Sequence, residues 1–500
     1  MFRSGKSILA QYVFVLAHGT ASLKPSHLHL IRLIGLFAIS VSAGWRYHTP
    51  WDTVELFTAA GQLLQIQDKS GLTHSLGFDG FGRPATVTDS YGRRLSFTYN
   101  EEGYLETLTD PLARVTRFRY DESGNFIESL EPDSQTRKYH YENLSQRFSL
   151  TGITDERGVR VSSWTYDTFG RVETANHGGA LERRSYAYAR NQVTETDPLG
   201  TSRTYRYGMF RDMPYLTGVT QPCSACGSGS TAEQGYDARG FVTSTRDFRN
   251  NLATYQRDTR GLITAMTEAV GTPEARTTAI TWHPQFYLPT RVVKPITGGS
   301  RTTVLTYDSQ GNRLTRAITA NNQTRTWTYT YNANGQVLTE DGPRTDVVDL
   351  TTYTYSSTGD LATMTNALGH VTRFETYDAD GQLTRSVSPN GLITEYDYDS
   401  RQRLVETKEG SEVTAYRYDG TGNLTRATLP DSSFLTYIYD NANRLTEVSD
   451  NLGHRMKYAL DGDGNRLKDE TFAPNNALVE TMSRVYDGLG RLKETLGAEQ

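Results

Sequence analysis

Apolar and polar positions alternate along this chain in short runs, and each run ends in the same signature. In Tyr416-Arg417-Tyr418 the alternate residues are aromatic, and Asp419 follows at once, with Gly422 three residues further on. Period-two alternation of this kind is typical of a β-strand with one aromatic and one polar face. An Asp side chain can bond to nearby backbone, and Gly readily adopts a positive φ. The Asp-x-x-Gly segment therefore predicts a tight turn.

A second strand follows each of these turns. Arg444–Asp450 is such a strand, and Asn451-Leu452-Gly453 then forms another turn. Each repeat is therefore predicted to be a β-hairpin that a further hairpin turn joins to the next. Leu445 and Val448 are three residues apart, which places them on opposite faces of a flat strand, so we expect a bulge or strong twist there.

The signature recurs along the chain, and neighbouring clear copies are about 20 to 26 residues apart, a period typical of repeat arrays. The residues that define the repeat in representative copies are Tyr120, Asp121, Gly124, Tyr307, Asp308, Gly311, Tyr377, Asp378, Gly381, Tyr418, Asp419 and Gly422.

The number of repeats constrains the fold. About twenty units would give roughly forty strands, whereas open twisted sheets rarely exceed about ten without curling or splitting. Each unit has little material for a second covering layer. We therefore predict an all-β fold of tandem hairpins in one long curled sheet, a spiral or shell that is hollow rather than a packed sandwich.

The stretch Tyr377-Asp378-Ala379-Asp380-Gly381-Gln382-Leu383-Thr384 resembles the Rhs/YD-repeat family. That family includes bacterial Rhs polymorphic toxins, wall-associated proteins, the cocoon-forming subunits of insecticidal toxin complexes, and teneurins. The resemblance covers roughly residues 52–500, and Phe57 to Tyr99 is similar to the early part of an Rhs shell. It implies a β-strand spiral that encloses a C-terminal toxic or signalling domain, and it is more specific for architecture than for activity.

Rhs cores usually end in an autoproteolytic junction that contains Asp-Pro-x-Gly. Asp197-Pro198-Leu199-Gly200 has these letters, but it leads into another strand, Arg203 to Tyr207, so we interpret it as an ordinary turn between hairpins. A fresh unit begins at Tyr486 and no junction follows it. We therefore expect a partial shell, with the toxin or effector domain supplied in cis or in trans.

Residues 1–51 carry no repeat, so the array proper is assigned to residues 52–500. The run from Leu33 to Ala43 is apolar and uncharged; it is too short to span the ~30 Å membrane core but suits a signal-peptide h-region. The alternative is a non-native leader. The sequence therefore favours a secreted or cell-surface protein without a transmembrane span.

Composition agrees with a repeat array of half-polar strands. Hydrophobic residues make up only 36%, but aromatics reach 11%, with 31 Tyr and 44 Gly, which argues against disorder. The formal net charge of -5 provides no basic field for nucleic acid, so nucleic-acid partners are not expected.

The repeat rhythm lapses near residues 208–235, where a segment rich in Gly and Ser carries Cys223 and Cys226, the two cysteines of the chain. These thiols could form a disulfide that staples the loop, could be inert, or could bind a metal with two further ligands. His177 and His283 are the nearest histidines, and no motif links them to the pair.

No complete catalytic, metal or cofactor motif is present in the sequence. The calcium-like Asp461-Gly462-Asp463 stretch has Arg466 where the loop needs Gly and Phe472 where it needs Glu. We therefore expect no cofactor and no enzyme activity, and we predict a structural shell segment that encapsulates or presents a toxin. The alternative is a surface adhesion or carbohydrate-binding protein whose aromatic faces stack on glycans.

Overall fold

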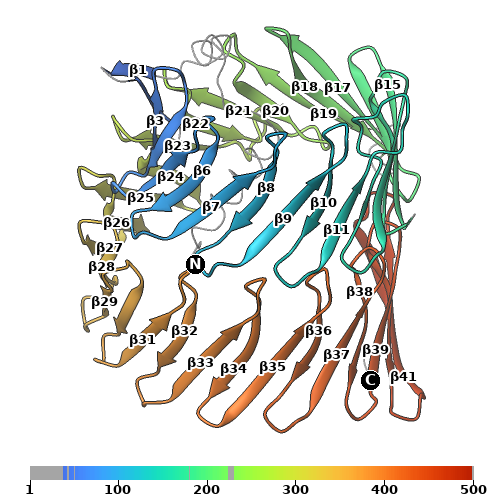
Figure 1. Cartoon of the computed structure of the whole chain (residues 1–500). Helices are drawn as coiled ribbons and strands as arrows, with labels where there is room; N and C mark the ends of the chain where they lie inside the picture. Colours follow the sequence, from blue (N-terminus) through green and yellow to red (C-terminus); the bar gives the residue numbers. More distant parts are fainter. Residues whose placement is uncertain (1–37, 42–43, 50, 180, 223–229, 498–500) are drawn as a thin grey trace. The chain divides into compact units, whose positions relative to one another are not determined.

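The computed structural model describes residues 38–41, 44–49, 51–179, 181–222 and 230–497 (Figure 1). In these ranges the chain forms 42 strands that belong to one sheet, and it contains no helix. A helix able to cross a membrane is accordingly not found in the described ranges.

The first half of the strands are β1 (Ala38–Val41), β2 (Gly44–His48), β3 (Val54–Thr58), β4 (Leu63–Gln67), β5 (Thr73–Phe78), β6 (Pro84–Asp89), β7 (Arg94–Tyr99), β8 (Leu105–Thr109), β9 (Val115–Tyr120), β10 (Phe126–Leu130), β11 (Thr136–His140), β12 (Gly152–Thr154), β13 (Arg160–Tyr166), β14 (Val172–His177), β15 (Glu182–Ala189), β16 (Gln192–Thr196), β17 (Ser202–Phe210), β18 (Met213–Gln221), β19 (Ser230–Tyr236), β20 (Val242–Arg246) and β21 (Leu252–Arg257). The second half are β22 (Ile263–Glu268), β23 (Arg276–Trp282), β24 (Pro289–Ile296), β25 (Gly299–Tyr307), β26 (Arg313–Ala320), β27 (Gln323–Tyr331), β28 (Val337–Asp341), β29 (Leu350–Tyr355), β30 (Leu361–Thr365), β31 (Val371–Tyr377), β32 (Leu383–Val387), β33 (Ile393–Tyr398), β34 (Leu404–Glu409), β35 (Glu412–Tyr418), β36 (Leu424–Thr428), β37 (Phe434–Tyr439), β38 (Leu445–Asp450), β39 (Arg455–Leu460), β40 (Arg466–Phe472), β41 (Leu478–Tyr486) and β42 (Leu492–Leu496).

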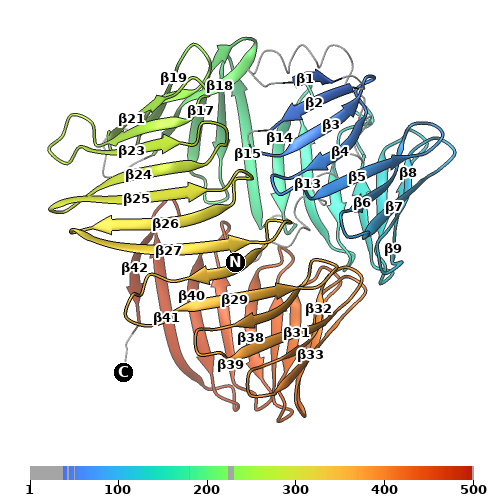
Figure 2. The same cartoon turned by 90° about the vertical axis from the view of Figure 1, so that its left-hand side faces the viewer.

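Strands pair antiparallel with their neighbours in the chain, as in β5–β6, β6–β7 and β7–β8. Successive turns therefore lie at opposite edges of the sheet. We call the turns that follow the repeat aromatic, such as β7–β8 after Tyr99, YD turns. The turns that join one repeat to the next, such as β6–β7, are inter-repeat turns. Figure 2 shows the long strands β24 to β27 running side by side in this manner.

Many turns of both kinds share one internal geometry. In the YD turn that begins at Asp79, the Gly82 N–H donates to the Asp79 carbonyl at 3.0 Å, and the Asp79 N–H donates to the Arg83 carbonyl at 2.9 Å. Asp79 Oδ1 accepts the N–H groups of Phe81 and Arg83, each at 2.9 Å, while Gly82 has a φ of +77°. This is a type I turn followed by a residue with positive φ, as the Asp-x-x-Gly pattern predicts.

The predicted bulge is confirmed, and it lies beside the repeat tyrosine. Tyr439 pairs with Leu445 and Ile438 pairs with Glu447, so Thr446 is the extra residue. Because of this insertion, Leu445 and Val448 both lie opposite tyrosines, Tyr439 and Tyr437. The same shift occurs at other repeat tyrosines, among them Tyr99, Tyr166, Tyr307, Tyr331 and Tyr418. The bulge places the apolar residues of the second strand on the aromatic face.

The repeat tyrosine also bonds to the preceding repeat. The Tyr377 hydroxyl donates to the Leu361 carbonyl at 2.7 Å, and Tyr439 donates to Leu424 at 2.9 Å. Burial, with a smaller contribution from the Asp360 charge, raises the pKa of Tyr377 to about 12, so the hydroxyl retains its proton. Equivalent bonds are made by Tyr99, Tyr166, Tyr188, Tyr236, Tyr307, Tyr331, Tyr355 and Tyr418.

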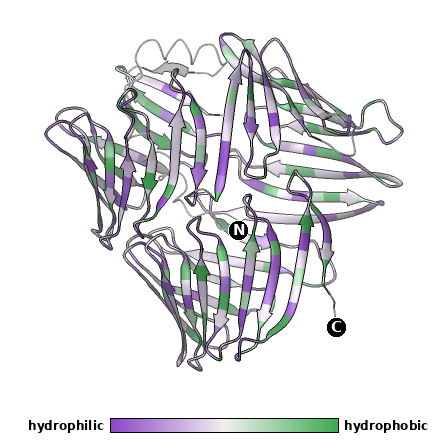
Figure 3. Ribbon diagram, turned by 90° about the vertical axis from the view of Figure 1, so that its right-hand side faces the viewer, coloured by the Kyte–Doolittle hydropathy of each residue, from purple (hydrophilic) through white to green (hydrophobic). Residues whose placement is uncertain are grey.

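The sheet has little covered interior. The buried hydrophobic side chains of the described residues are Val54, Phe97, Leu105, Val161, Tyr329 and Ala442. Figure 3 shows hydrophobic and hydrophilic residues interspersed along the strands. On the polar face, threonine hydroxyls bond in cross-strand pairs, as in Thr306–Thr315 at 2.7 Å and Thr330–Thr339 at 2.7 Å. The predicted lack of a second covering layer is consistent with this distribution.

The chain divides into two compact units. Unit 1 combines the described residues up to Arg117 with Thr278–Gly391, and unit 2 combines Phe118–Thr277 with the chain from Leu392 onward. Each unit therefore brings an early and a late segment of the sheet together. The predicted fold class, all-β tandem hairpins in a curled sheet, is confirmed.

Two features predicted from sequence fall wholly or partly outside the described residues. Cys223 and Cys226 lie outside them, so the alternatives for this pair stay predictions. Of the run from Leu33 to Ala43, only Ala38–Val41 is described, and it forms β1, paired with β2. The lapse of rhythm near residues 208–235 includes a regular hairpin, β17–β18.

The tyrosine bond predicts the outcome of a matched pair of substitutions in β37. Tyr439→Phe removes the bond to the Leu424 carbonyl and should lower the free energy of unfolding by about 0.5–1.5 kcal/mol. Tyr437→Phe is the control, because within the described chain no hydrogen bond of its hydroxyl is found. Urea unfolding followed by fluorescence measures both variants. Equal losses in the two variants would contradict a role for the hydroxyl bond.

Candidate functional site

In unit 1 the inter-repeat turns of the early segment contact the YD turns of the late segment (Figure 1). Lys69 Nζ donates to the Gly311 carbonyl at 2.9 Å, and Arg93 Nη1 lies 3.6 Å from Asp360 Oδ1. Arg114 forms an ion pair with Asp380. We call this row of contacts the unit 1 seam. It joins cations of the inter-repeat edge to oxygen acceptors of the YD edge.

The unit 1 seam also requires space at the turn glycines. A Cβ at Gly335 would lie 2.6 Å from Ser70 Cβ, and one at Gly359 would lie under 3.0 Å from the Tyr91 ring. At Gly82, whose turn is outside the seam, the nearest atom would be Gln62 Nε2 at 3.7 Å. Glycine at Gly335 and Gly359 is therefore needed for the close approach as well as for the positive φ.

Unit 2 has a corresponding seam with more charge. Glu156, whose side chain is 2% exposed, accepts from Arg137 Nη2 at 3.1 Å and from Arg401 Nη2 at 3.3 Å. Arg401 also lies 3.7 Å from Asp133 Oδ2. Arg157 Nη1 donates to the Asp440 carbonyl at 3.4 Å. We call this row of contacts, made of ion pairs and a bond to a backbone carbonyl, the unit 2 seam.

Glu131 lies near the charges of the unit 2 seam. Burial raises its pKa above the ordinary value of 4.5; the Arg401 charge lowers it, and the nearby charges of Glu156 and Asp133 raise it further. Ionisation of Glu131 is therefore less favourable in the folded protein than in the unfolded chain.

The Asp197-Pro198-Leu199-Gly200 stretch is an ordinary inter-repeat turn, as the sequence indicates. The Gly200 N–H donates to the Asp197 carbonyl at 3.0 Å, and the N–H groups of Leu199 and Thr201 donate to Asp197 Oδ1 at 3.1 and 2.8 Å. Asp197 is 4% exposed and pairs with Arg203 at 2.9 Å. Thr201 bonds to the Gly488 carbonyl of a YD turn, so this turn is part of the unit 2 seam.

The repeat-defining acids act as turn anchors. Burial raises the pKa of Asp419, but hydrogen bonds from Thr421 and Asn423 lower it by more, so this pKa lies below its ordinary value. Asp121 and Asp308 bond in the same way to Asn125 and Asn312. The residues that define the repeat are therefore spread over successive turns rather than gathered in one site. They are Tyr120, Asp121, Gly124, Tyr307, Asp308, Gly311, Tyr377, Asp378, Gly381, Tyr418, Asp419 and Gly422.

Several turns also contact the next repeat through an arginine. Arg403 Nε donates to Asp399 Oδ2 at 2.6 Å, and its guanidinium lies 5.0 Å from the centre of the Tyr418 ring. The same arrangement occurs earlier in the chain: Arg83 Nε donates to Asp79 Oδ2 at 2.7 Å, and its guanidinium lies 4.4 Å from the centre of the Tyr99 ring. Carboxylate, guanidinium and ring thus connect one hairpin to the following one.

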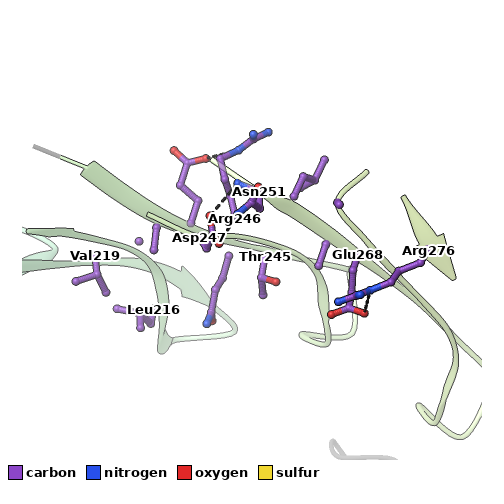
Figure 4. A pocket seen from close by; sticks show the side chains of 15 residues that line it. Leu216, Val219, Thr245, Arg246, Asp247, Asn251, Glu268 and Arg276 are labelled. Carbon is purple, nitrogen blue, oxygen red and sulfur yellow. Dashed lines mark hydrogen bonds and ion pairs between the residues drawn. The ribbon is translucent and has the colours of Figure 1, made fainter. Parts of the chain in front are cut away.

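A hollow of about 520 Å³ lies over β18 to β23 in unit 2 (Figure 4). Its polar groups bond to one another: Arg276 Nε donates to Glu268 Oε2 at 3.0 Å, and Asn251 Nδ2 donates to Asp247 Oδ2 at 2.8 Å. Leu216 contributes apolar lining. These residues include no nucleophile beside a general base. In the described ranges, His, Asp and Glu side chains are not grouped in threes or more in a way that could hold a metal.

The seam pairs are the functional residues that sequence reasoning missed. Arg114 and Asp380 are 266 residues apart, and no local pattern relates them. The available signal was the basic residue that ends some inter-repeat turns, namely Arg93 and Arg114. That signal marks an edge that can dock, but it does not identify the partner turn.

The comparisons with known proteins agree with this architecture. Residues 298–494 match the teneurin YD-shell family model. The match to a crystal structure of TcdB2-TccC3-Cdc42 has 14% sequence identity and a TM-score of 0.56, and it covers 91% of this chain and 30% of that chain. TcdB2-TccC3 without its hypervariable C-terminal region is 15% identical with a TM-score of 0.59, and covers 92% of this chain and 27% of that one. No curated protein matches the chain.

The repeated hairpins, the anchored turns and the seams define a YD-repeat shell architecture. The recognition made from the sequence, an Rhs/YD-repeat chain, is confirmed by the family model and the shared fold. This chain spans 27% to 30% of the length of these two solved chains.

Alanine substitution of turn glycines tests the unit 1 seam. Gly359 and Gly82 have φ values of +78° and +77°, so a Cβ at either position carries the same backbone strain of about 1 kcal/mol. Gly359→Ala also pushes against the Tyr91 ring. It should therefore lower the free energy of unfolding by about 1–3 kcal/mol more than Gly82→Ala, as measured in urea. Equal losses would show that the close contact does not stabilise the protein.

Glu131→Gln tests the unit 2 seam. Because the folded pKa of Glu131 is raised, its stabilising contribution is present below the ordinary value of 4.5 and is lost as pH rises through the folded pKa. The variant should have a higher melting temperature than the native protein at neutral pH, and the difference should vanish in acid. Glu122→Gln, at an exposed turn, is the control and should change little. A destabilised Glu131→Gln at neutral pH would refute the assignment.

Proposed function

We propose that this chain is a structural shell segment of a secreted YD-repeat protein, which encapsulates or presents a toxin or effector domain supplied in cis or in trans. The observation that carries the proposal is the pair of turn seams. They hold together early and late segments of a one-layer sheet without a second layer packed between them. A wall of this construction leaves its sheet faces available to a cargo.

The polar face of the sheet suits a wall that confines without binding tightly. Its threonine hydroxyls already bond in pairs, such as Thr354–Thr363 at 2.7 Å and Thr376–Thr384 at 2.7 Å. Few of these hydrogen-bonding groups are left unsatisfied to hold a cargo strongly. The role needs no catalysis by the wall.

The comparisons support the same role. The chain shares its fold with TcdB2-TccC3, for which one structure lacks the hypervariable C-terminal region. We propose the same organisation here: a constant fold that presents a variable domain. Secretion or display at the cell surface forms part of the proposal, because the family resemblance implies it and the run from Leu33 to Ala43 resembles a signal segment.

Protection of a C-terminal reporter tests the proposal. A small reporter that carries the site of a sequence-specific protease is fused after Gln500 by a short linker, and its cleavage rate is compared with that of the free reporter. We expect at least about tenfold slower cleavage, because proteolysis tracks the exposed population of the site. The same reporter on a long Gly/Ser linker should be cleaved at the free rate.

The seam variant links protection to the wall. Gly359→Ala should raise the cleavage rate of the short-linker fusion, whereas Gly82→Ala should not. Cleavage of the short-linker fusion at the free rate, with the native fold intact by circular dichroism, would count against encapsulation. Specific binding to a glycan array would instead favour the adhesion role.

A further inference from the structure

Unit 1 carries turns of both kinds that do not take part in its seam. The YD turns of its early segment, at residues 79–83 and 100–104, present Phe81, which is 86% exposed. The inter-repeat turn at residues 366–370 of its late segment presents Leu368, which is 79% exposed. One chain therefore offers a bare example of each edge that the seam joins.

The unit 1 seam shows what each edge requires of the other. Counting the Asp or Asn as the first turn residue, the third residues of inter-repeat turns, Ser70 and Tyr91, cover the glycines of YD turns. In the turns that end in arginine the fifth residue supplies a nitrogen donor: Arg114 pairs with Asp380, the third residue of its YD turn. In the turn that begins at Asp68 the donor is instead the second residue, Lys69. The contact thus combines a side chain over a glycine with a donor beside an acid.

The bare edges meet both requirements. In the turn at 366–370 the third residue is Leu368 and the fifth is His370, whose imidazole has an N–H donor in either protonation state. On the YD edge, the turn at 100–104 has an acid, Glu102, as its third residue, like Asp380. A Cβ at Gly103 would meet Arg83 Nη1 at 3.4 Å and no other atom within 4 Å, so no residue of an inter-repeat turn covers that glycine.

The bare YD edge carries a carboxylate that no cation of the described residues neutralises. Arg83 is neutralised by Asp79 at 2.7 Å and stacks against Phe81 and Tyr99 at 4.8 and 4.4 Å. Glu102 is exposed, and among the described residues it has no ion-pair partner. An acid beside an exposed aromatic ring favours a partner that brings a donor and an apolar side chain together.

We propose that a second copy of this chain docks its turn at residues 366–370 on the YD turns at 79–83 and 100–104, with Leu368 against the turn glycines and Phe81, and His370 beside Glu102. The two surfaces differ, so the contact is head-to-tail and can add further copies, in a ring or an open chain. The inference goes beyond the proposed function and holds whether or not a cargo is enclosed.

Sedimentation velocity of the full chain over a range of concentrations tests this contact. We expect reversible association that Leu368→Glu weakens by at least about tenfold. Leu144→Glu is the matched control: Leu144 is 97% exposed but lies in unit 2, outside both surfaces. His370→Glu should weaken association, and adding Glu102→Arg to the same chain should restore it, because the reversed pair attracts again.

Each outcome decides the proposal. A chain that stays monomeric at every concentration overturns it, as does a Leu144→Glu variant that loses association as fully as Leu368→Glu. Failure of the double variant to recover, with both single variants folded, overturns the pairing of His370 with Glu102. Since the readout is association state, none of these results bears on the reporter-protection test of encapsulation.

Discussion

The side-chain oxygen that begins the turns, a carboxylate in many of them, is the interaction on which this structure depends. One oxygen of Asp79 accepts two backbone N–H groups, and the other holds the arginine that ends the turn. With the turn fixed, the chain reverses at a defined residue, and the bulge beside the aromatic that precedes the turn falls at a constant place. A sheet with so few buried apolar side chains gains its order from these local polar bonds, repeated from hairpin to hairpin.

The second level of order joins hairpins to one another. The tyrosine hydroxyl bonds to the preceding repeat, and the turn arginine stacks on the aromatic ring of the next, so neighbouring repeats are tied in both directions. Such nearest-neighbour terms stabilise a repeat array as a sum along its length. The seams add bonds between residues that are far apart in the sequence, and these bonds hold the early and late segments of the sheet together within each unit.

The periodic features of the fold could be predicted from the sequence, because they arise from local chemistry. The alternation before Tyr418, the turn at Asp419 and the bulge implied by Leu445 and Val448 each involve residues within one hairpin. The seams could not be predicted, because the pairing of Arg114 with Asp380 depends on the summed twist of many strands. The tyrosine bond to the preceding hairpin lay between these cases: its spacing was regular, but its acceptor was a backbone carbonyl, which no residue type reveals.

The seams also constrain how such an array can change in evolution. Lys69 and Gly311 are 242 residues apart, and Arg114 and Asp380 are 266 apart. Duplication of a single hairpin between the early and late segments of unit 1 would offset all of these partners at once. Gain or loss of hairpins should therefore be tolerated outside the stretch that a seam spans, or in blocks that restore the offset, and lineages with this architecture should differ in length by steps rather than by single repeats.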